Sequence, residues 1–450
     1  MDKNIKVLKD TSNNEIYPVT FSEAIYMNNG SRLEDNIDYL KEKSLEIGTM
    51  SRLQTNNKST LVGAINEILD HETNPQYGVR FEGSNPYGTR LGQAVNKVTY
   101  TALGIEDTNY DFNDFDNLYP WSEIRRCLMD SNGTVYAYEG EPNFDPDTTE
   151  YDVMVEIPKF YQKYIVNEQD NYIEYWITST LLDDYELNPA FKTQMGSELE
   201  KIYIGAYEAT SDNNVLFSRA NKLPGLNTFQ GELRDRAERK GEGWKMIDIY
   251  ERNIIEFLFV VEYATINSQS AILGNSDGLY SRTGITNTVD RHSNATIDPN
   301  SLSSFRYRFM ENIWGNVWEI IDGCYLDEMG NLYASMYYKN YSNPESYYNM
   351  NIKADFQNNY DYIVKMNFDR DNKFMKVPVL AGGETSSNNR HYSDILICSN
   401  LYFKNIMLVG GSILEDGMEI GLFATEFLDI TRQKQYSGTR LCYRPDKLNM

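Results

Sequence analysis

The most constraining stretch of the chain covers residues 311–320 and reads Glu-Asn-Ile-Trp-Gly-Asn-Val-Trp-Glu-Ile. Trp314 and Trp318 flank Gly315 and Asn316, which are the residue types that tolerate a positive φ at the least steric cost. Large apolar side chains therefore surround a tight backbone bend, and the residues after the bend predict a short strand. Taken alone, the stretch predicts a tryptophan-anchored turn in a hydrophobic core.

Length, charge and hydropathy exclude several classes of protein. A chain of 450 residues is long enough for two or three domains. Its formal charge of −24 opposes binding to a nucleic-acid backbone or to an anionic membrane surface. The longest apolar run, at 254–261, contains Glu256 and is shorter than the roughly 18 residues that a membrane span needs. Residues 1–6 lack the apolar segment of a signal peptide. We therefore expect neither nucleic-acid binding nor membrane insertion.

Residues that could bind a metal or carry redox chemistry are sparse. The four cysteines are widely spaced and never form Cys-x-x-Cys, which argues against a disulfide scaffold and a zinc ribbon. An acidic cluster at 111–116 lacks the glycine of a calcium-binding EF-hand loop, so a solvated loop is favoured over a calcium site. We expect no metal and no cofactor. The cysteines are Cys127, Cys324, Cys398 and Cys442, and the acidic cluster contains Asp111, Asn113, Asp114 and Asp116.

The N-terminal part of the chain carries helical patterns after a polar segment at 1–30. From residue 33 the apolar side chains recur in steps of four, three and seven, which fits the seam of a coiled coil, and Thr60 is a plausible cap of a second helix. Helices with so little apolar surface need partner chains to fold, which favours dimers or trimers. The alternative is that they pack on the surface of their own domain. The predicted oligomerisation residues are Leu33, Ile37, Leu40, Ile47, Leu61, Ile65 and Ile68.

After a linker at 71–77 the pattern is β-rich, with two helices. The segment 152–161 alternates as a strand, which is predicted to stop at Pro158. A second strand is predicted at 172–177 and is expected to pair with the first. A charged helix at 232–240 has Thr228 as its predicted cap and Gly241 at its C-terminal end. The second helix begins with the capping box Asp-x-x-Glu at 248–251 and continues through a wide apolar stripe, which predicts a buried helix.

Two short motifs together resemble a known fold family. The Gly-Asn-Val-Trp-Glu segment at 315–319 and the Gly-x-Arg-Leu-Cys segment at 438–442 resemble the signature of the formylglycine-generating-enzyme-like branch of the C-type lectin fold. The resemblance covers residues from about 80 to 450 and implies an α+β body with a twisted antiparallel sheet and two helices. The residues that carry this fold signature are Trp314, Gly315, Asn316, Trp318, Glu319, Gly438 and Arg440.

A third motif resembles proteins of phage tails. Leu-Val-Gly-Ala-Ile-Asn-Glu-Ile at 61–68 is similar to a segment in the stalks of tail fibres and baseplate-attached receptor-binding proteins. The resemblance implies a tail-attachment segment at 1–30, a helical stalk at 31–71 and a lectin-like body at 78–450. It also implies a homotrimer in the tail of a phage or phage-like particle, made in the bacterial cytoplasm and bound to other tail or baseplate proteins through its N-terminus.

The loops between Cys324 and Arg432 form the exposed face in the resembled fold, and here they are rich in tyrosine and asparagine. Aromatic rings stack on sugar C–H faces and amides bond hydroxyl groups, so we expect a host-surface glycan or protein as receptor. An AT-rich genome would also raise the tyrosine count. The receptor-binding candidates are Tyr337, Tyr338, Tyr341, Tyr347, Tyr348, Asn349, Asn389, Arg390, His391 and Tyr392.

No catalytic residue is predicted. The resembled family includes an oxidase with two cysteines close in sequence near its C-terminus, but here Cys398 and Cys442 lie far apart. The chain also lacks Gly-x-Ser-x-Gly, a phosphate-binding loop and His-Glu-x-x-His. We therefore expect a binding protein rather than an enzyme. A structural baseplate subunit is the first alternative, and a glycan hydrolase with two facing carboxylates is a weaker one.

Overall fold

The structure is a computed structural model, in which the chain forms two compact units, residues 1–73 and 74–450. In the first unit it describes two short antiparallel strands, β1 (Leu8–Lys9) and β2 (Glu15–Ile16). The predicted stalk, with all seven oligomerisation residues, lies outside the described residues. In the second unit the structure describes residues 74–99, 113–193, 195–276, 280–287, 294–296, 303–335, 342–356, 360–368, 376–381, 392–398, 404–415 and 419–445.

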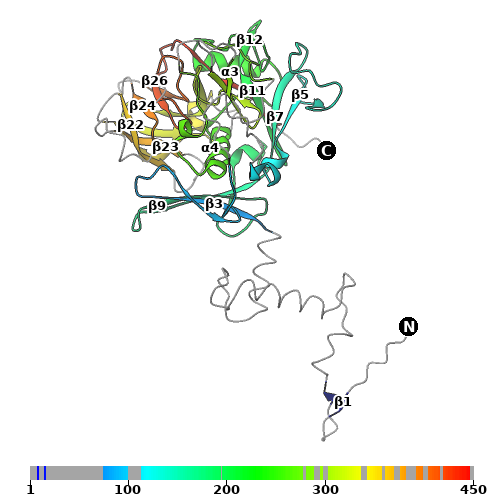
Figure 1. The fold of residues 1–450 in the computed structure, drawn as a ribbon. Coiled ribbons are helices and arrows are strands. Elements are labelled where there is room, and N and C mark those ends of the chain that lie inside the picture. The colour runs from blue at the N-terminus through cyan, green and yellow to red at the C-terminus, as the bar shows by residue number, and fades with distance from the viewer. Residues whose placement is uncertain are drawn as a thin grey trace. The chain divides into compact units, whose positions relative to one another are not determined.

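A five-stranded antiparallel sheet opens the second unit (Figure 1). The strand predicted at 172–177 is present, but it pairs with its hairpin partner at 161–167 and with the strand at 76–82. Its predicted pairing with the strand at 152–158 is therefore wrong, because a short turn returns the chain beside the preceding strand first. In sheet order the strands are β10 (Glu186–Leu187), β8 (Tyr161–Asn167), β9 (Tyr172–Thr178), β3 (Gln76–Glu82) and β4 (Thr89–Gly92).

A six-stranded sheet brings the end of the chain next to its middle. Its central strands pair antiparallel, and the strand that starts at Asp152 ends at Pro158 as predicted. The Arg-Leu-Cys segment at 440–442 lies between two strands from the middle of the chain. In sheet order the strands are β14 (Trp244–Met246), β28 (Arg440–Tyr443), β11 (Lys201–Glu208), β7 (Asp152–Pro158), β5 (Arg125–Met129) and β6 (Val135–Tyr138).

The largest sheet has ten strands. The two strands at the ends of its strand order are consecutive in the chain and separated only by Ala354, so the two edges of the sheet lie close together and the sheet is curled. The strand predicted after the tryptophan turn is nine residues long and contains Cys324. In sheet order the strands are β20 (Tyr348–Lys353), β19 (Asn331–Ala334), β18 (Trp318–Leu326), β25 (Asn405–Val409), β26 (Thr425–Asp429), β24 (Ile395–Cys398), β22 (Tyr360–Phe368), β23 (Lys376–Ala381) and β21 (Asp355–Phe356), and β27 (Ser437–Gly438) pairs with β18.

Smaller elements connect the sheets. Two short β-structures and several single-turn 3-10 helices lie in the connections between the main strands. The short strands are β12 (Thr210–Asp212), β13 (Val215–Phe217), β15 (Asn294–Thr296), β16 (Ser303–Tyr307) and β17 (Met310–Glu311). The 3-10 helices are η3 (Asp114–Asn117), η4 (Trp121–Glu123), η5 (Pro189–Phe191), η6 (Ser268–Ser270) and η8 (Pro344–Ser346).

The described residues include two α-helices. The charged helix α3 (Gln230–Glu238) has Phe229 at its N-cap position, so the predicted cap at Thr228 is wrong; the Thr228 hydroxyl donates to Glu232. It also ends before the position that would make Gly241 its C′ residue. Helix α4 (Ile249–Tyr263) matches its prediction: the capping box is present and every residue is buried. Neither helix is both long and apolar enough to cross a bilayer. The described fold is α+β and mostly sheet.

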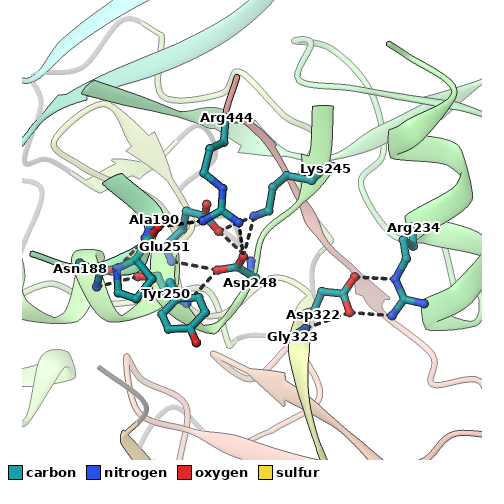
Figure 2. A network of polar contacts seen from close by, with 11 residues as sticks. Asn188, Ala190, Arg234, Lys245, Asp248, Tyr250, Glu251, Asp322, Gly323 and Arg444 are labelled. Atoms are coloured by element: carbon teal, nitrogen blue, oxygen red, sulfur yellow. Dashed lines mark hydrogen bonds and ion pairs between the residues drawn. The ribbon is translucent and has the colours of Figure 1, made fainter. Parts of the chain in front are cut away.

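The capping residue of α4 belongs to a buried polar network (Figure 2). The Asp248 carboxylate accepts hydrogen bonds from the backbone N–H groups of Tyr250 and Glu251, at 2.8 and 3.3 Å. It also pairs with Lys245 Nζ at 3.0 Å and with Arg444 Nη2 at 3.3 Å. The helix N-terminus is therefore tied to both β14 and the end of β28, since Lys245 is in β14 and Arg444 directly follows β28.

The polar signature residues make buried contacts between strands. Gly315 and Asn316 have φ values of 75° and 61°, so the predicted positive-φ bend is confirmed. The Asn316 amide donates to Glu208 at 2.7 Å, and burial raises the pKa of Glu208 well above its ordinary value. Arg440 donates through Nε to Glu319 Oε1 at 2.7 Å. These contacts join β11, β18 and β28, so the motif residues hold strands of two sheets together.

Candidate functional site

A groove of about 950 Å³ lies between the tip of the β8–β9 hairpin, β20 and β22. Its walls are residues 165–169 with Tyr172, residues 350–352, and residues 365–368. A smaller cavity of about 430 Å³ shares Asn167, Tyr172 and Lys365 with the groove, so the two spaces adjoin. Volumes in this range are typical of ligand sites in proteins.

The hairpin tip is shaped by its own side chains. The Asn167 side chain accepts from the Asp170 backbone N–H and donates to the Asp170 carboxylate, both at 2.9 Å, and this closes the turn. Asn171 has a φ of 51°, which asparagine adopts more readily than most residues. Below the tip, the rings of Tyr164 and Phe368 meet edge to face at 5.3 Å. This contact joins β8 to β22 next to the groove, whose lining includes Phe368.

The β20 wall is shaped by an asparagine turn. The Asn349 side chain accepts from the backbone N–H of Asn351 at 2.8 Å, and Asn351 has a φ of 55°. The pairing of β20 with β19 shifts in register at this place. Met350 and Ile352 are buried while Asn351 is exposed, so the turn presents the Asn351 amide at the groove. Asn349, a predicted receptor residue, thus positions a neighbour that lines the groove.

The groove combines amides with aromatic rings. Asn167, Gln169, Asn351 and Asn367 contribute amide groups, each of which can both donate and accept hydrogen bonds. Tyr172 and Phe368 add aromatic surface, and Glu168 and Lys365 are the charged residues of the lining. Because these two charges are opposite, the described lining has no net charge. Hydroxyl groups and apolar C–H faces of an uncharged ligand match such a lining.

A buried cation lies beneath the smaller cavity. Lys376 Nζ donates to the Tyr175 hydroxyl at 2.6 Å and lies 3.4 Å from a Glu256 carboxylate oxygen. Its ammonium group also lies 4.9 Å from the ring centre of Phe423. Burial lowers the pKa of Lys376 and raises that of Glu256. We interpret this pair as structural, because it ties β23 to α4 inside a shell of aromatic rings.

Among the described residues, none of the predicted receptor residues lines the groove. Tyr348 begins β20 and Tyr347 directly precedes it, and both are half-buried. Tyr392 does not fit a displayed role: it is 3% exposed, and its ring packs on Phe423 at 5.0 Å. It reaches only the wall of the smaller cavity. Six further candidates lie outside the described residues: Tyr337, Tyr338, Tyr341, Asn389, Arg390 and His391.

Tyr347 belongs to a small cluster of packed tyrosines. Tyr325 and Tyr333 stack face to face at 5.0 Å, and Tyr347 packs on Tyr325 at the same distance. Lys404 Nζ lies 3.4 Å from the centre of the Tyr325 ring. Burial raises the pKa of Tyr347. The predicted Tyr/Asn face is therefore partly used in packing within the largest sheet.

Sequence reasoning missed the contribution of the β8–β9 hairpin. Tyr172, Asn167 and Gln169 lie far from the predicted loops in sequence, but they line the groove. The polar run Asn-Glu-Gln-Asp-Asn at 167–171, between two strands of alternating polarity, was the available signal. It identifies a hairpin, although it does not show which other segment the hairpin tip will face.

The acidic cluster near residue 113 is engaged in internal contacts. Asn113 donates to Glu262 at 2.6 Å, Asp114 accepts from the Val98 N–H at 2.7 Å, and Asp116 pairs with Arg308 at 2.8 Å. Within the described parts of the chain, three or more His, Cys, Asp or Glu side chains do not gather in a metal-binding arrangement. Asp111 lies outside those parts.

Comparison with known proteins adds no family assignment. A scan against protein-family models and a search of curated proteins each returned no match.

Proposed function

We propose that this chain is a tail protein of a phage or phage-like particle that binds a glycan on the host surface. In this proposal, residues 1–30 attach to the tail or baseplate, residues 31–71 form a trimeric stalk, and the body is C-type-lectin-like. The stalk motif at 61–68 and the signature motifs at 315–319 and 438–442 support it through their resemblance to such proteins. Three copies on one particle would multiply weak single-site contacts.

The observation that carries the binding role is the composition of the groove. Four amide side chains and two aromatic rings line a space of about 950 Å³, with one acidic and one basic residue among them. Sugar rings present C–H faces that pack on aromatic surface, and their hydroxyl groups pair with amides. Glu168 is the one carboxylate in the described lining, whereas glycoside hydrolysis ordinarily uses two. The composition of the described lining therefore supports the proposal of glycan binding.

Binding of the full chain to host cells and purified envelope glycans tests this proposal. Tyr172→Ala and Asn367→Ala each remove one lining group, and Tyr136→Ala is the matched control, because Tyr136 is 51% exposed and lies in the edge strand β6. We expect saturable binding that both groove variants weaken and the control retains, with circular dichroism unchanged. Absence of binding by the unmodified chain to every candidate host would refute the receptor role and favour a structural baseplate subunit.

A further inference from the structure

Tyr172 belongs both to the groove lining and to the outer face of the five-stranded sheet. Side chains on a strand alternate between faces, so Tyr172, Glu174 and Trp176 of β9 share one face. Tyr175 and Ile177 lie on the opposite face and are buried where α4 packs on the sheet. Tyr172 lines the groove. The two aromatic rings of this face are four residues apart, which is about 13 Å along a strand.

Trp176 is held in place by its neighbours without any ligand. It pairs across the sheet with Gly78, where a Cβ atom would lie 2.5 Å from the indole ring. A Cβ atom at Gly92 would lie 3.0 Å from the same ring. The indole therefore rests on bare backbone, and its Nε1–H donates to Glu174 at 2.6 Å. It remains partly exposed. A ring oriented in advance loses little conformational entropy when it binds a ligand.

The same carboxylate organises the space between the two rings. Glu174 accepts from Arg80 Nε at 2.7 Å, and the Arg80 guanidinium lies 4.1 Å from the centre of the Tyr172 ring. Arg80 and Glu174 are paired with each other. Lys163 Nζ lies 5.3 Å from the centre of the Trp176 ring, and the acids Asp184 and Glu174 lie close enough to act on it. With two cations and two acids, the strip between Tyr172 and Trp176 has little net charge. The buried Glu174 carboxylate thus positions both the Trp176 indole and the Arg80 guanidinium, which lies over the Tyr172 ring.

We infer that Trp176 is a second stacking platform outside the groove, and that the ligand is an extended, uncharged glycan chain. This inference rests on the proposed function and adds the chain length and charge of the ligand. A compact sugar would fill the groove alone, whereas a chain leaving the groove past Tyr172 reaches Trp176 along β9. Single-stranded nucleic acid also stacks on aromatic rings, but the formal charge of −24 opposes a polyanion.

The experiment compares two size fractions of neutral envelope polysaccharide from the host, prepared by partial hydrolysis. The short fraction fits within the groove, and the long fraction spans the distance to Trp176. We expect Trp176→Ala in the full chain to weaken binding of the long fraction about tenfold and to leave the short fraction unchanged. Trp176→Phe, which keeps an aromatic ring, should retain most of the affinity.

Fluorescence of the unmodified chain provides a readout that does not depend on how the variants fold. We expect the long fraction, but not the short one, to change the indole emission, and Trp176→Phe to abolish that change. Equal affinity of both fractions for the unmodified chain and for Trp176→Ala would overturn the inference while leaving the groove as a glycan site. If neither fraction bound the unmodified chain, the proposed function itself would fail and the inference with it.

Discussion

Replacing Arg440 with methionine should destabilise the body strongly. The guanidinium donates to Glu319 Oε1 through Nε and Nη2, both at 2.7 Å, and to the backbone oxygens of Gly205 and Glu311 at 3.1 and 2.7 Å. Both side chains of the pair are almost completely buried. Arg440→Met would leave the Glu319 carboxylate in the interior with Arg252, 3.9 Å away, as its nearest remaining cation.

Breaking a buried ion pair by removing one partner costs about 3 to 5 kcal/mol. Whole proteins are stable by only about 5 to 15 kcal/mol, so this loss should be a large share of the total. Urea unfolding followed by tryptophan fluorescence measures the change as a shift of the midpoint. Arg432→Met is the matched control: its side chain is 58% exposed and its pairing distance to Asp429 is 3.9 Å, so the cost should be below about 1 kcal/mol.

A double variant separates the stranded charge from lost packing. Arg440→Met combined with Glu319→Gln removes both charges and should recover part of the stability that Arg440→Met loses. If Arg440→Met were no more destabilising than Arg432→Met, the signature arginine would not have the structural role described above.

Three further predictions concern other buried groups. Burial raises the pKa of Asp394 from 3.8 to about 8, so the folded state retains a proton that the unfolded state releases, and stability falls as pH rises between these values. The free energy of unfolding of Asp394→Asn, measured with urea, should therefore rise relative to that of the unmodified chain from pH 5 to 8. A constant difference between the two free energies over this range would contradict the prediction. Asp248→Ala should lower the free energy of unfolding by about 3 kcal/mol, because it removes a helix cap and the partner of two cations. Thr228→Ala, the control, should lower it by under about 0.5 kcal/mol, and equal losses would contradict the assignment of Asp248 as the cap. All four cysteines are buried free thiols, so a thiol reagent should react slowly with the folded chain and with four groups after unfolding; rapid labelling before unfolding would contradict their burial.

Local signals predicted the parts of the fold that local chemistry determines. The capping box at Asp248 and the apolar stripe after it specify α4, because both act within one or two helical turns. The Gly315–Asn316 bend follows from the low steric cost of positive φ at these residues. Pro158 ends its strand because it lacks the N–H that a further ladder bond requires.

Long-range pairing could not be read from the same signals. The strand at 172–178 pairs with β8 and β3, and its alternating pattern predicts a strand without identifying the partner. Thr228 has the right residue type for a cap, but the helix begins one residue too late for it, with Phe229 at the N-cap position. Tyr392 lies in a segment with the composition of a binding loop, but its side chain is buried against Phe423. A residue type limits which contacts are possible, and the surrounding fold selects among them.

The candidate site could be predicted only in its chemistry. Tyrosine and asparagine were expected to form the binding surface, and these residue types do line the groove. Its three walls, however, come from segments near residues 167, 351 and 367, and the first is widely separated in sequence from the other two. No wall contains a pattern that specifies the others, so the sequence alone could not identify the groove.

The position of β3 determines how the body would respond to tension. β3 begins at Gln76, shortly after the boundary between the two units, and forms seven residue pairs with β9 and four with β4. If a particle holds the chain by its N-terminus while a receptor holds the groove, the pull runs along the axis of β3. All its ladder hydrogen bonds then bear the load together in shear, instead of opening one after another. Such a geometry would make β3 a mechanical clamp between anchor and receptor.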